Sequence, residues 1–319
     1  MCPSVLRLAA DSPRERLLEY DCEMTDIHSI DELQRALHSH NYVAERGLAT
    51  AIYLATKLRR PLFLEGEAGV GKTEVAKVLA SLFETDLIRL QCYEGLDINH
   101  AVYEWNYTRQ ILHLRLVEAR GEKPTEEELF DEAFLLKRPL LQAIETSRVK
   151  PPVLLIDEID RSDEEFEAYL LEVLSDFQIS VPELGTIKAV QRPYVILTSN
   201  RTREVHDALK RRCLYFWIDY PDFEKEMNIV RARVPEAPQN LARQVTSFIQ
   251  ELRREDLYKV PGVAETLDWI TALVALDRHQ LDLSIVEDTL GVVLKYQDDV
   301  VKVSGETARR ILERARVEV

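Results

Sequence analysis

The sequence predicts an α/β fold, in which a parallel sheet is followed by a smaller all-helical domain. Short apolar runs typical of buried strands alternate with stretches of helical spacing over about residues 36–220. A glycine-rich loop joins one of these strands to the helix after it. Beyond residues 220–222 the pattern becomes purely helical, with five helices expected over residues 224–234, 240–255, 263–276, 284–296 and 306–319.

Length and composition are those of a globular protein. The 319 residues suffice for two cooperating domains, and 46% hydrophobic and 30% charged residues are ordinary values. No apolar run approaches the roughly eighteen residues that a membrane span needs. Residues 1–20 lack the long apolar core of a secretory signal, so we expect a cytoplasmic protein.

The net charge and the cysteine positions argue against non-specific nucleic-acid binding, a cysteine metal site and a disulfide-stabilised fold. The net charge of −15 opposes non-specific nucleic-acid binding, because phosphates must be met by Lys and Arg. Cys2, Cys22, Cys92 and Cys213 are scattered, with no CxxC pair and no matching histidine cluster. We therefore expect neither a metal site nor a disulfide framework from them.

Two helices and a strand are expected before the glycine-rich loop. Ser29 and Glu32 have the spacing of a capping box, which predicts a helix through about His38. A second helix is expected over residues 45–58. The apolar run 62–64 then predicts a short buried strand.

The loop itself, GEAGVGKT, fits the P-loop pattern G-x(4)-G-K-[ST]. Glycines let successive backbone N–H groups face phosphate oxygens, and the following helix adds its positive N-terminal end. Lys72 can reach the β- and γ-phosphates, and the Thr73 hydroxyl can ligate magnesium. A glycine turn without ligand is the alternative, which the flanking strand and helix disfavour. The expected nucleotide-binding residues are Gly66, Glu67, Ala68, Gly69, Val70, Gly71, Lys72, Thr73 and Glu74.

A second apolar run, PPVLLIDEID at residues 151–160, ends in carboxylates. Its apolar part is too short for a free-standing helix and predicts a central parallel strand, whose carboxyl end is where such sheets place their chemistry. Asp157 would hold magnesium, and Glu158 would orient and activate the attacking water. An acidic helix cap is the alternative. However, the capping box of residues 162–165 begins five residues after Asp157 and does not account for the pair.

Two later segments add polar groups. PYVILTSN, residues 193–200, predicts a strand ending at Asn200, whose amide can bond the γ-phosphate or the lytic water. Arg211 and Arg212 precede another strand-like run. In a ring-forming ATPase, one arginine here would reach the neighbouring subunit's nucleotide and stabilise transition-state charge. A strand-end asparagine and a solvated arginine pair are the ordinary alternatives.

Together, the glycine loop, acidic strand, asparagine-ended strand and late arginines resemble the order of motifs in AAA+ ATPases. More closely, the chain resembles the MoxR family over about residues 25–315, most specifically over 151–220. One subgroup accompanies the maturation of carbon monoxide dehydrogenase-type molybdenum enzymes. The stretches similar to it include CYEGLD, YEWNYTRQ, FLLKRPLLQAI, LTSNRTREVHDALKRRC and VEDTLGVVLKYQDD.

The resemblance implies a hexameric ring, hydrolysis of ATP with Mg²⁺, a partner carrying a von Willebrand factor A domain, and a metalloenzyme client. By matching motifs, the resemblance assigns the Walker A role to Lys72 and Thr73 and the Walker B role to Asp157 and Glu158. It assigns the sensor 1 role to Asn200 and the trans arginine finger to Arg212 ahead of Arg211. It also implies that Tyr42 and Val43 contact the adenine. One departure stands out. Many relatives begin a lid helix with a sensor 2 arginine, whereas Glu265 lies near that position here.

The resemblance also divides the chain. Residues 1–24 differ from the rest and would form a disordered tail, unless translation starts at Met24. The nucleotide-binding domain would span 25–221 and the helical lid 222–319. Residues 178–190 predict a β-hairpin, which fits the pre-sensor 1 insertion of the family.

The region after the second strand, LIRLQC, carries a polar insertion with a helix expected from Thr125. Tyr93, Tyr103, Trp105 and Tyr107 lie near that strand's exit, where rings can present pore residues. Packing inside the domain is the alternative for these aromatic side chains.

The leading prediction is an ATP-driven oligomeric chaperone that remodels or matures a metalloenzyme. A P-loop kinase that passes phosphate to a small molecule, and a nucleotide-dependent scaffold with incidental hydrolysis, are the alternatives. No NKxD guanine motif occurs, which favours ATP over GTP.

Overall fold

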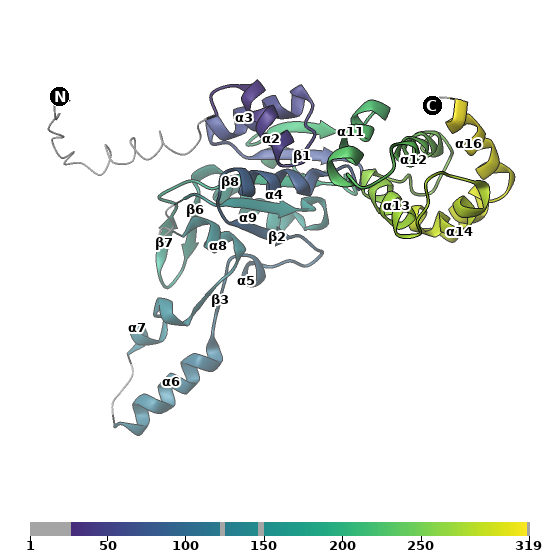
Figure 1. The fold of residues 1–319 in the computed structure, drawn as a ribbon. Helices are drawn as coiled ribbons and strands as arrows, with labels where there is room; N and C mark the ends of the chain where they lie inside the picture. The colour runs from purple at the N-terminus through teal and green to yellow at the C-terminus, as the bar shows by residue number, and fades with distance from the viewer. Residues whose placement is uncertain (1–26, 122–124, 146–149, 318–319) are drawn as a thin grey trace, which may run out of the picture.

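The structure is a computed structural model that describes residues 27–121, 125–145 and 150–317. Figure 1 shows a central sheet domain, a helical domain to one side, and an arm that projects from the sheet domain. The expected tail of residues 1–24, including Cys2 and Cys22, lies outside the described residues. Cys92 and Cys213 are buried free thiols.

Five strands form a parallel sheet, as the sequence predicts. In sheet order they are β2 (Leu87–Gln91), β5 (Val153–Asp157), β8 (Tyr194–Ser199), β1 (Leu62–Gly66) and β9 (Leu214–Ile218). Every pair is parallel, so the carboxyl ends of all five strands meet at one edge. The acidic strand β5 is thus separated by β8 alone from β1, which leads into the glycine loop.

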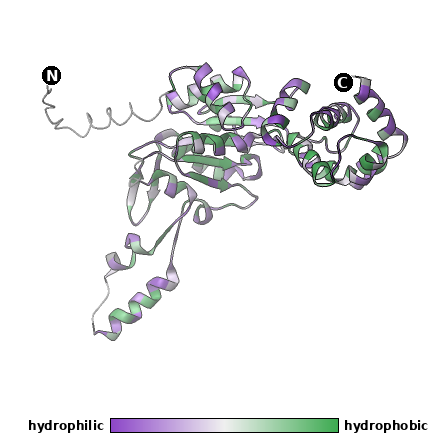
Figure 2. Ribbon diagram, in the orientation of Figure 1, coloured by the Kyte–Doolittle hydropathy of each residue, from purple (hydrophilic) through white to green (hydrophobic). Residues whose placement is uncertain are grey.

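The three inner strands are buried along their whole length, whereas the edge strand β2 alternates between buried and exposed residues. Leu62 and Leu64 pack into one hydrophobic core and Phe63 into the other. Strands covered on both faces read as continuous apolar runs, which is why these segments were recognisable. In Figure 2 the strands are accordingly green.

Helices cover both faces of the sheet. One face packs against α2 (Ile30–Ser39), α3 (Arg46–Leu58) and α4 (Lys72–Leu82), and the other against α8 (Pro139–Ile144) and α9 (Glu164–Asp176). The Ser29 hydroxyl accepts from the Glu32 N–H at 3.2 Å and caps α2. The predicted start of this helix is therefore confirmed.

The capping box expected at residues 162–165 was wrong by one residue. The N–H of Phe166 donates to Asp163 Oδ1 at 2.8 Å, so Asp163 is the N-cap of α9. Ser162 instead ends the 3₁₀ turn η2 (Ile159–Arg161), and its hydroxyl donates to the Ile159 carbonyl at 2.8 Å. Ser162 is therefore the C-cap of the 3₁₀ turn, and α9 begins after Asp163.

Beyond the sheet domain, six helices surround a core that includes Phe248 and Trp269. They are α11 (Phe223–Arg233), α12 (Gln239–Leu252), α13 (Val263–Ala275), α14 (Leu283–Val293), α15 (Gln297–Val303) and α16 (Glu306–Val317). Five are expected from the sequence. The short helix α15 is not, and the run expected to continue to residue 296 ends at Val293.

The arm leaves the sheet domain through β3 (Tyr103–Trp105) and returns through β4 (Leu135–Lys137), which pair antiparallel. Between them lie α6 (Tyr107–Ala119), α7 (Glu126–Leu129) and η1 (Glu132–Phe134). The helix expected from Thr125 corresponds to α7, whereas α6 is not predicted by the sequence. Hydrophobic and hydrophilic residues are mixed along α6, as the view in Figure 2 shows, and the helix has no single apolar face by which the sequence could predict it.

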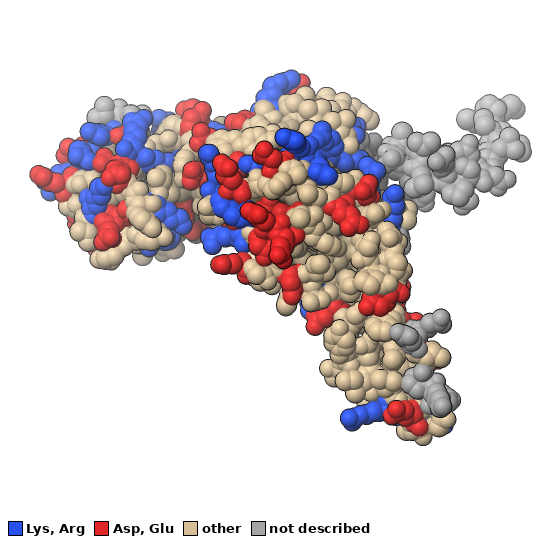
Figure 3. Space-filling view, turned by 180° about the vertical axis from the view of Figure 1, so that it is seen from behind, with Lys and Arg blue, Asp and Glu red and all other residues tan. Residues whose placement is uncertain are grey.

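The arm exposes apolar side chains. Ile111, Leu112 and Leu116 of α6 are 52%, 59% and 52% exposed. Seen from behind in Figure 3, most of the arm is tan, with charged side chains near its tip. The described part of the chain contains no helix with the length and apolarity needed to cross a membrane.

A hairpin of two strands and two short helices complete the sheet domain. The stretch for which a hairpin is expected holds the antiparallel pair β6 (Gln178–Val181) and β7 (Gly185–Lys188). Short helices α5 (Ile98–Ala101) and α10 (Asp207–Lys210) lie in the loops before β3 and β9.

Candidate functional site

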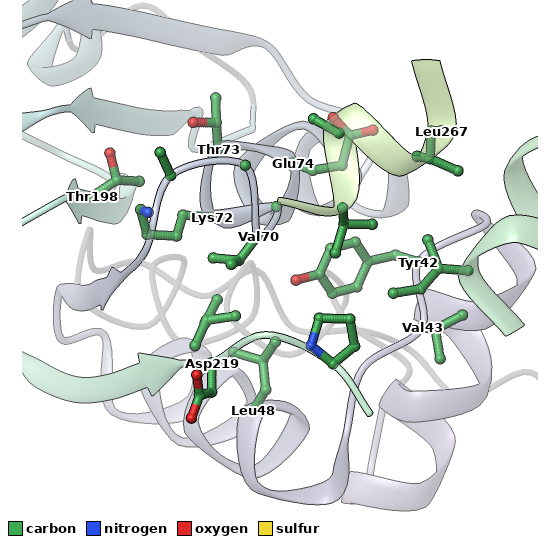
Figure 4. A pocket seen from close by; sticks show the side chains of 18 of the residues that line it. Tyr42, Val43, Leu48, Val70, Lys72, Thr73, Glu74, Thr198, Asp219 and Leu267 are labelled. Atoms are coloured by element: carbon green, nitrogen blue, oxygen red, sulfur yellow. The ribbon is translucent and has the colours of Figure 1, made fainter. Parts of the chain in front are cut away.

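A cavity of about 370 Å³ lies between the carboxyl edge of the sheet and the helical domain. Its size falls within the range of small-molecule sites. In Figure 4, Lys72 and Thr198 lie at one end, Tyr42, Val43 and Leu267 at the other, and Val70 between them. One end is therefore polar and the other largely apolar.

The glycine loop (residues 66–73) forms the polar end. Gly69 and Gly71 have φ angles of 76° and 93°, a region that residues with a side chain rarely adopt. The Lys72 ammonium donates to the carbonyls of Gly66 at 2.8 Å and Glu67 at 2.5 Å. Burial lowers the pKa of Lys72 to about 8, although nearby carboxylates, with Asp160 foremost, oppose the shift. A polyphosphate would supply the negative charge that this buried ammonium lacks.

Thr73 and Asp157 come together as expected. The Thr73 hydroxyl donates to Asp157 Oδ1 at 2.9 Å, and the Thr198 hydroxyl donates to the same oxygen at 2.5 Å. Arg89 of β2 donates from Nη2 to the other oxygen, Oδ2, at 2.6 Å. Asp157 is only 4% exposed in its side chain, so these partners compensate its buried charge.

Glu158 is held in position by three neighbours. Its backbone φ is 55°, a left-handed conformation that costs about 1–2 kcal/mol for a residue with a side chain. Its N–H donates to Thr198 Oγ1 at 2.9 Å. Asn200 Nδ2 and Gln91 Nε2 donate to its two carboxylate oxygens, each at 3.1 Å. The carboxylate is thereby oriented at the end of β5, beside Asp157.

A further carboxylate that the sequence did not single out fastens the loop after β8. Asp160 is buried and accepts from the N–H groups of Asn200 at 3.2 Å and Thr202 at 2.8 Å. The Thr202 hydroxyl donates to it as well, at 2.7 Å. Asp160 therefore fixes the backbone that carries the Asn200 amide.

The apolar end takes residues from three parts of the chain. Tyr42 and Val43 line it together with Leu48, Ile218, Pro221, Ile229 and Leu267. Burial, reinforced by the charges of Glu74 and Glu45, raises the pKa of Tyr42, so its hydroxyl stays protonated. Such a surface suits a flat, weakly polar group such as a nucleobase.

Most of the expected site residues line this one cavity. They are Ala68, Gly69, Val70, Gly71, Lys72, Thr73, Glu74, Asp157, Glu158, Asn200, Tyr42 and Val43. Gly66 and Glu67 contribute only carbonyl groups that hold Lys72.

Arg211 and Arg212 do not line the cavity of their own chain. The Arg211 carbonyl accepts from Arg60 at 3.1 Å. The Arg212 guanidinium donates from Nε to Ser175 Oγ at 2.5 Å and from Nη1 to the Ala208 carbonyl at 2.9 Å. The structure therefore does not bring either arginine together with the other predicted site residues of the same chain.

The aromatic residues near the exit of β2 divide into two groups. Trp105 is buried, and Tyr103 packs against the same core. Tyr93 and Tyr107 are 46% and 63% exposed. The pore role considered for these residues stays a prediction.

Sequence reasoning missed Thr198, Arg89, Gln91, Lys225 and Arg233. Thr198 lies two residues before Asn200 in the strand run, so a polar strand end was its signal. Arg89 and Gln91 are the exposed residues of the alternating strand β2, and Gln91 lies opposite Asp157 in the sheet register. No local pattern marks Lys225 and Arg233, which come from α11.

The oxygens of Thr73 and Asp157 make a donor set that suits magnesium. One hydroxyl and one carboxylate converge at 2.9 Å beside the buried Lys72, and Mg²⁺ prefers hard oxygen ligands and keeps several waters. These residues therefore fit the metal that a bound nucleoside triphosphate brings.

Comparison with known proteins agrees with this geometry. Residues 61–213 match the family model of the AAA domain (dynein-related subfamily). This range begins one residue before β1 and ends one residue before β9. The match covers most of the sheet domain and just under half of the chain, so the sheet domain is similar to an AAA domain over this range.

Two curated relatives come from Staphylococcus aureus, strains bovine RF122 / ET3-1 and NCTC 8325 / PS 47, and both are described as uncharacterized proteins. Each is 26% identical over 226 residues, which covers 69% of this chain and 77% of the relative.

Among solved structures, the RuvB Holliday junction branch migration motor of Thermotoga maritima has a TM-score of 0.44 at 18% identity. The match covers 90% of this chain and 78% of that one. Domain III of the replication initiation protein DnaA, also from Thermotoga maritima, has a TM-score of 0.44 at 16% identity, covering 81% and 96% of the two chains.

Proposed function

We propose that the protein is a Mg²⁺-dependent ATPase of the MoxR type, which works as an oligomeric ring to remodel or mature a metalloenzyme. The observation that carries the ATPase proposal is the clustering around one cavity of Lys72, Thr73, Asp157, Glu158 and Asn200. A loop for phosphates, a metal-binding oxygen pair and an oriented carboxylate are the parts that hydrolysis of a nucleoside triphosphate requires.

The residues divide the work as follows. Backbone N–H groups of the glycine loop and Lys72 bind the phosphates, while Thr73 and Asp157 hold the metal. Magnesium supplies charge neutralisation at the phosphate oxygens when it is bound. Glu158 accepts a proton from the attacking water, and Asn200, which bonds Glu158 Oε1, keeps that carboxylate oriented.

We assign the trans finger to Arg212, with Arg211 as the second choice. Neither lines the cavity of its own chain. Arg212 lies at the exposed end of α10, with its guanidinium tethered only to Ser175 and the Ala208 carbonyl. Hydrolysis would then be completed between subunits of a ring, for which a hexamer is the state that the family resemblance implies.

A protein client and a von Willebrand factor A-domain partner enter the proposal through the same resemblance. The exposed apolar residues of α6 support a macromolecular partner over a small-molecule acceptor, because an isolated chain gains nothing from apolar surface in water. A molybdenum hydroxylase resembling carbon monoxide dehydrogenase is the client we propose.

Glu158→Gln tests the ATPase proposal. We expect the variant to bind Mg-ATP with wild-type affinity while steady-state phosphate release falls at least about 100-fold, because the amide cannot accept a proton. Glu165→Gln is the matched control, since this exposed acid lies in the first turn of α9, away from the cavity. We expect its turnover to stay within about twofold of wild type.

Product analysis completes the test. Free phosphate, without a phosphorylated acceptor, is the expected product of the wild-type protein. Normal turnover of Glu158→Gln, or a phosphorylated small molecule among the products, would contradict the proposal.

A further inference from the structure

The helical domain presents one face of α11 to the cavity. Lys225, Ile229 and Arg233 all line it, and a spacing of four residues places them in one row along the helix. Among the described residues that line the cavity, the cations are Lys72, Lys225 and Arg233. Both cations that come from the helical domain therefore belong to α11.

The start of α13 also reaches the cavity. It packs directly against the glycine loop and carries the acidic residue Glu265. The Ala264 N–H donates to the Gly69 carbonyl at 3.2 Å. A Cβ on Gly262 would lie 2.7 Å from the Ala68 carbonyl oxygen, so the two backbones are in direct contact. Glu265 accepts from the Gly262 N–H at 2.9 Å and caps its own helix. Among the described residues at the start of α13, 262–267, there is no Lys or Arg.

Arg233 is bonded to an acid that belongs to the phosphate-binding helix. Its Nη1 donates to Glu74 Oε1 at 2.8 Å. Glu74 lies in the first turn of α4, whose N-terminus follows the glycine loop, so its charge would repel a polyphosphate there. The Lys77 ammonium donates to the other oxygen, Oε2, at 3.1 Å. Arg233 therefore offsets a negative charge in the first turn of the helix that follows the glycine loop.

The pair is open enough to exchange partners. The side chains of Arg233 and Glu74 are 40% and 26% exposed, and a guanidinium has donors beyond the one that Glu74 uses. Lys225 is placed differently. It donates at 3.1 Å to Glu45, the N-cap of α3, which does not line the cavity.

We propose that Arg233 is the cation by which the helical domain binds the phosphates of the nucleotide, and that Glu74 and phosphate compete for its guanidinium. The proposal rests on the proposed function, because it assumes a nucleoside triphosphate in this cavity. A guanidinium can bond a phosphate through two N–H groups, which would draw the helical domain onto the sheet domain.

Binding of unlabelled ATP, ADP and adenosine, measured by competition against a fluorescent ATP analogue with Mg²⁺, tests this proposal. We expect Arg233→Gln to weaken ATP binding at least about 10-fold, ADP binding less, and adenosine binding not at all, because one charge-assisted contact to phosphate is lost. Arg233→Lys should keep part of the affinity. Arg231→Gln is the matched control, because Arg231 lies in the same last turn and bonds only Asn228 of its own helix.

Glu74→Gln provides the complementary measurement. We expect it to tighten ATP binding, because the carboxylate no longer competes for Arg233 or repels phosphate. Unchanged ATP binding by Arg233→Gln, or an equal loss for ATP and adenosine, would overturn the proposal. Failure of the wild-type protein to bind any nucleotide would instead overturn the proposed function.

Discussion

At the scale of single residues, one hydroxyl joins the two acids of the site. Thr198 donates to Asp157 Oδ1 and accepts from the N–H of Glu158, so it fixes both the metal-binding oxygen and the strained turn beside it. The motif residues could be predicted because each ends a strand run or lies in the glycine loop. No roles could be assigned to Thr198, Arg89 and Gln91, because their partners lie on other strands. The sequence of one strand does not determine its register with another.

Thr198→Val tests this role. The valine side chain has nearly the same shape but neither donates nor accepts a hydrogen bond, which removes the partner of the partly buried Glu158 N–H. We expect turnover at saturating Mg-ATP to fall about 10- to 100-fold, as a hydrogen bond to a charged group is worth roughly 1.5–3 kcal/mol. Thr198→Ser keeps the hydroxyl and should retain most of the activity. Equal rates for the valine and serine variants would rule out this role for the hydroxyl.

At the scale of elements, a buried ion pair joins the first helices of the helical domain. Arg253 of this pair is 7% exposed and Glu226 0% in their side chains, and two hydrogen bonds of 2.7 Å connect them. The Thr266 hydroxyl donates to Glu226, and Arg253 donates to the Pro261 carbonyl, one residue before the Gly262 contact with the glycine loop. This network connects α11, α12 and the start of α13.

Removing one partner should destabilise the protein more than removing both. We expect Arg253→Met to lower the free energy of unfolding by about 3–5 kcal/mol, because it leaves a buried carboxylate unpaired. The double variant with Glu226→Leu should recover part of that loss. Chemical denaturation monitored by circular dichroism measures both effects. Losses that simply add in the double variant would contradict this coupling.

The elements themselves were predictable where one face is apolar. The sheet strands and five of the helices after residue 222 have such patterns. Helix α6 does not, because its projecting position leaves apolar residues exposed, and α15 has only seven residues. Asp299 in α15 is buried to accept the N–H groups of Tyr258 and Lys259, a tertiary role that no local pattern reveals.

At the scale of the whole molecule, assembly decides the activity we propose. The cavity is lined by the glycine loop, Thr73, Asp157 and Glu158, but by neither Arg211 nor Arg212. The fold and most of the cavity followed from the sequence, because they depend on one chain. The subunit interface could not be derived in the same way, because a single chain does not specify which surfaces meet.

Mixing two inactive variants tests the contribution of a neighbouring subunit. Arg212→Ala should lower turnover about 10³-fold or more while leaving assembly intact. Mixed with Glu158→Gln, it should regain activity, because about one quarter of random interfaces then combine a normal carboxylate with a normal finger. Phosphate release measures the recovery, and the same mixture made with Arg211→Ala in place of Arg212→Ala distinguishes the two arginines. Mixtures as inactive as the separate variants would contradict a finger supplied between subunits.

The arm begins and ends at neighbouring points, since Tyr103 lies opposite Lys137 in the β3–β4 pair. The segment between these strands can therefore lengthen, shorten or change in composition without shifting the strands of the central sheet. We would then expect related proteins that bind different partners to differ mainly in the arm, while the residues that line the cavity stay the same.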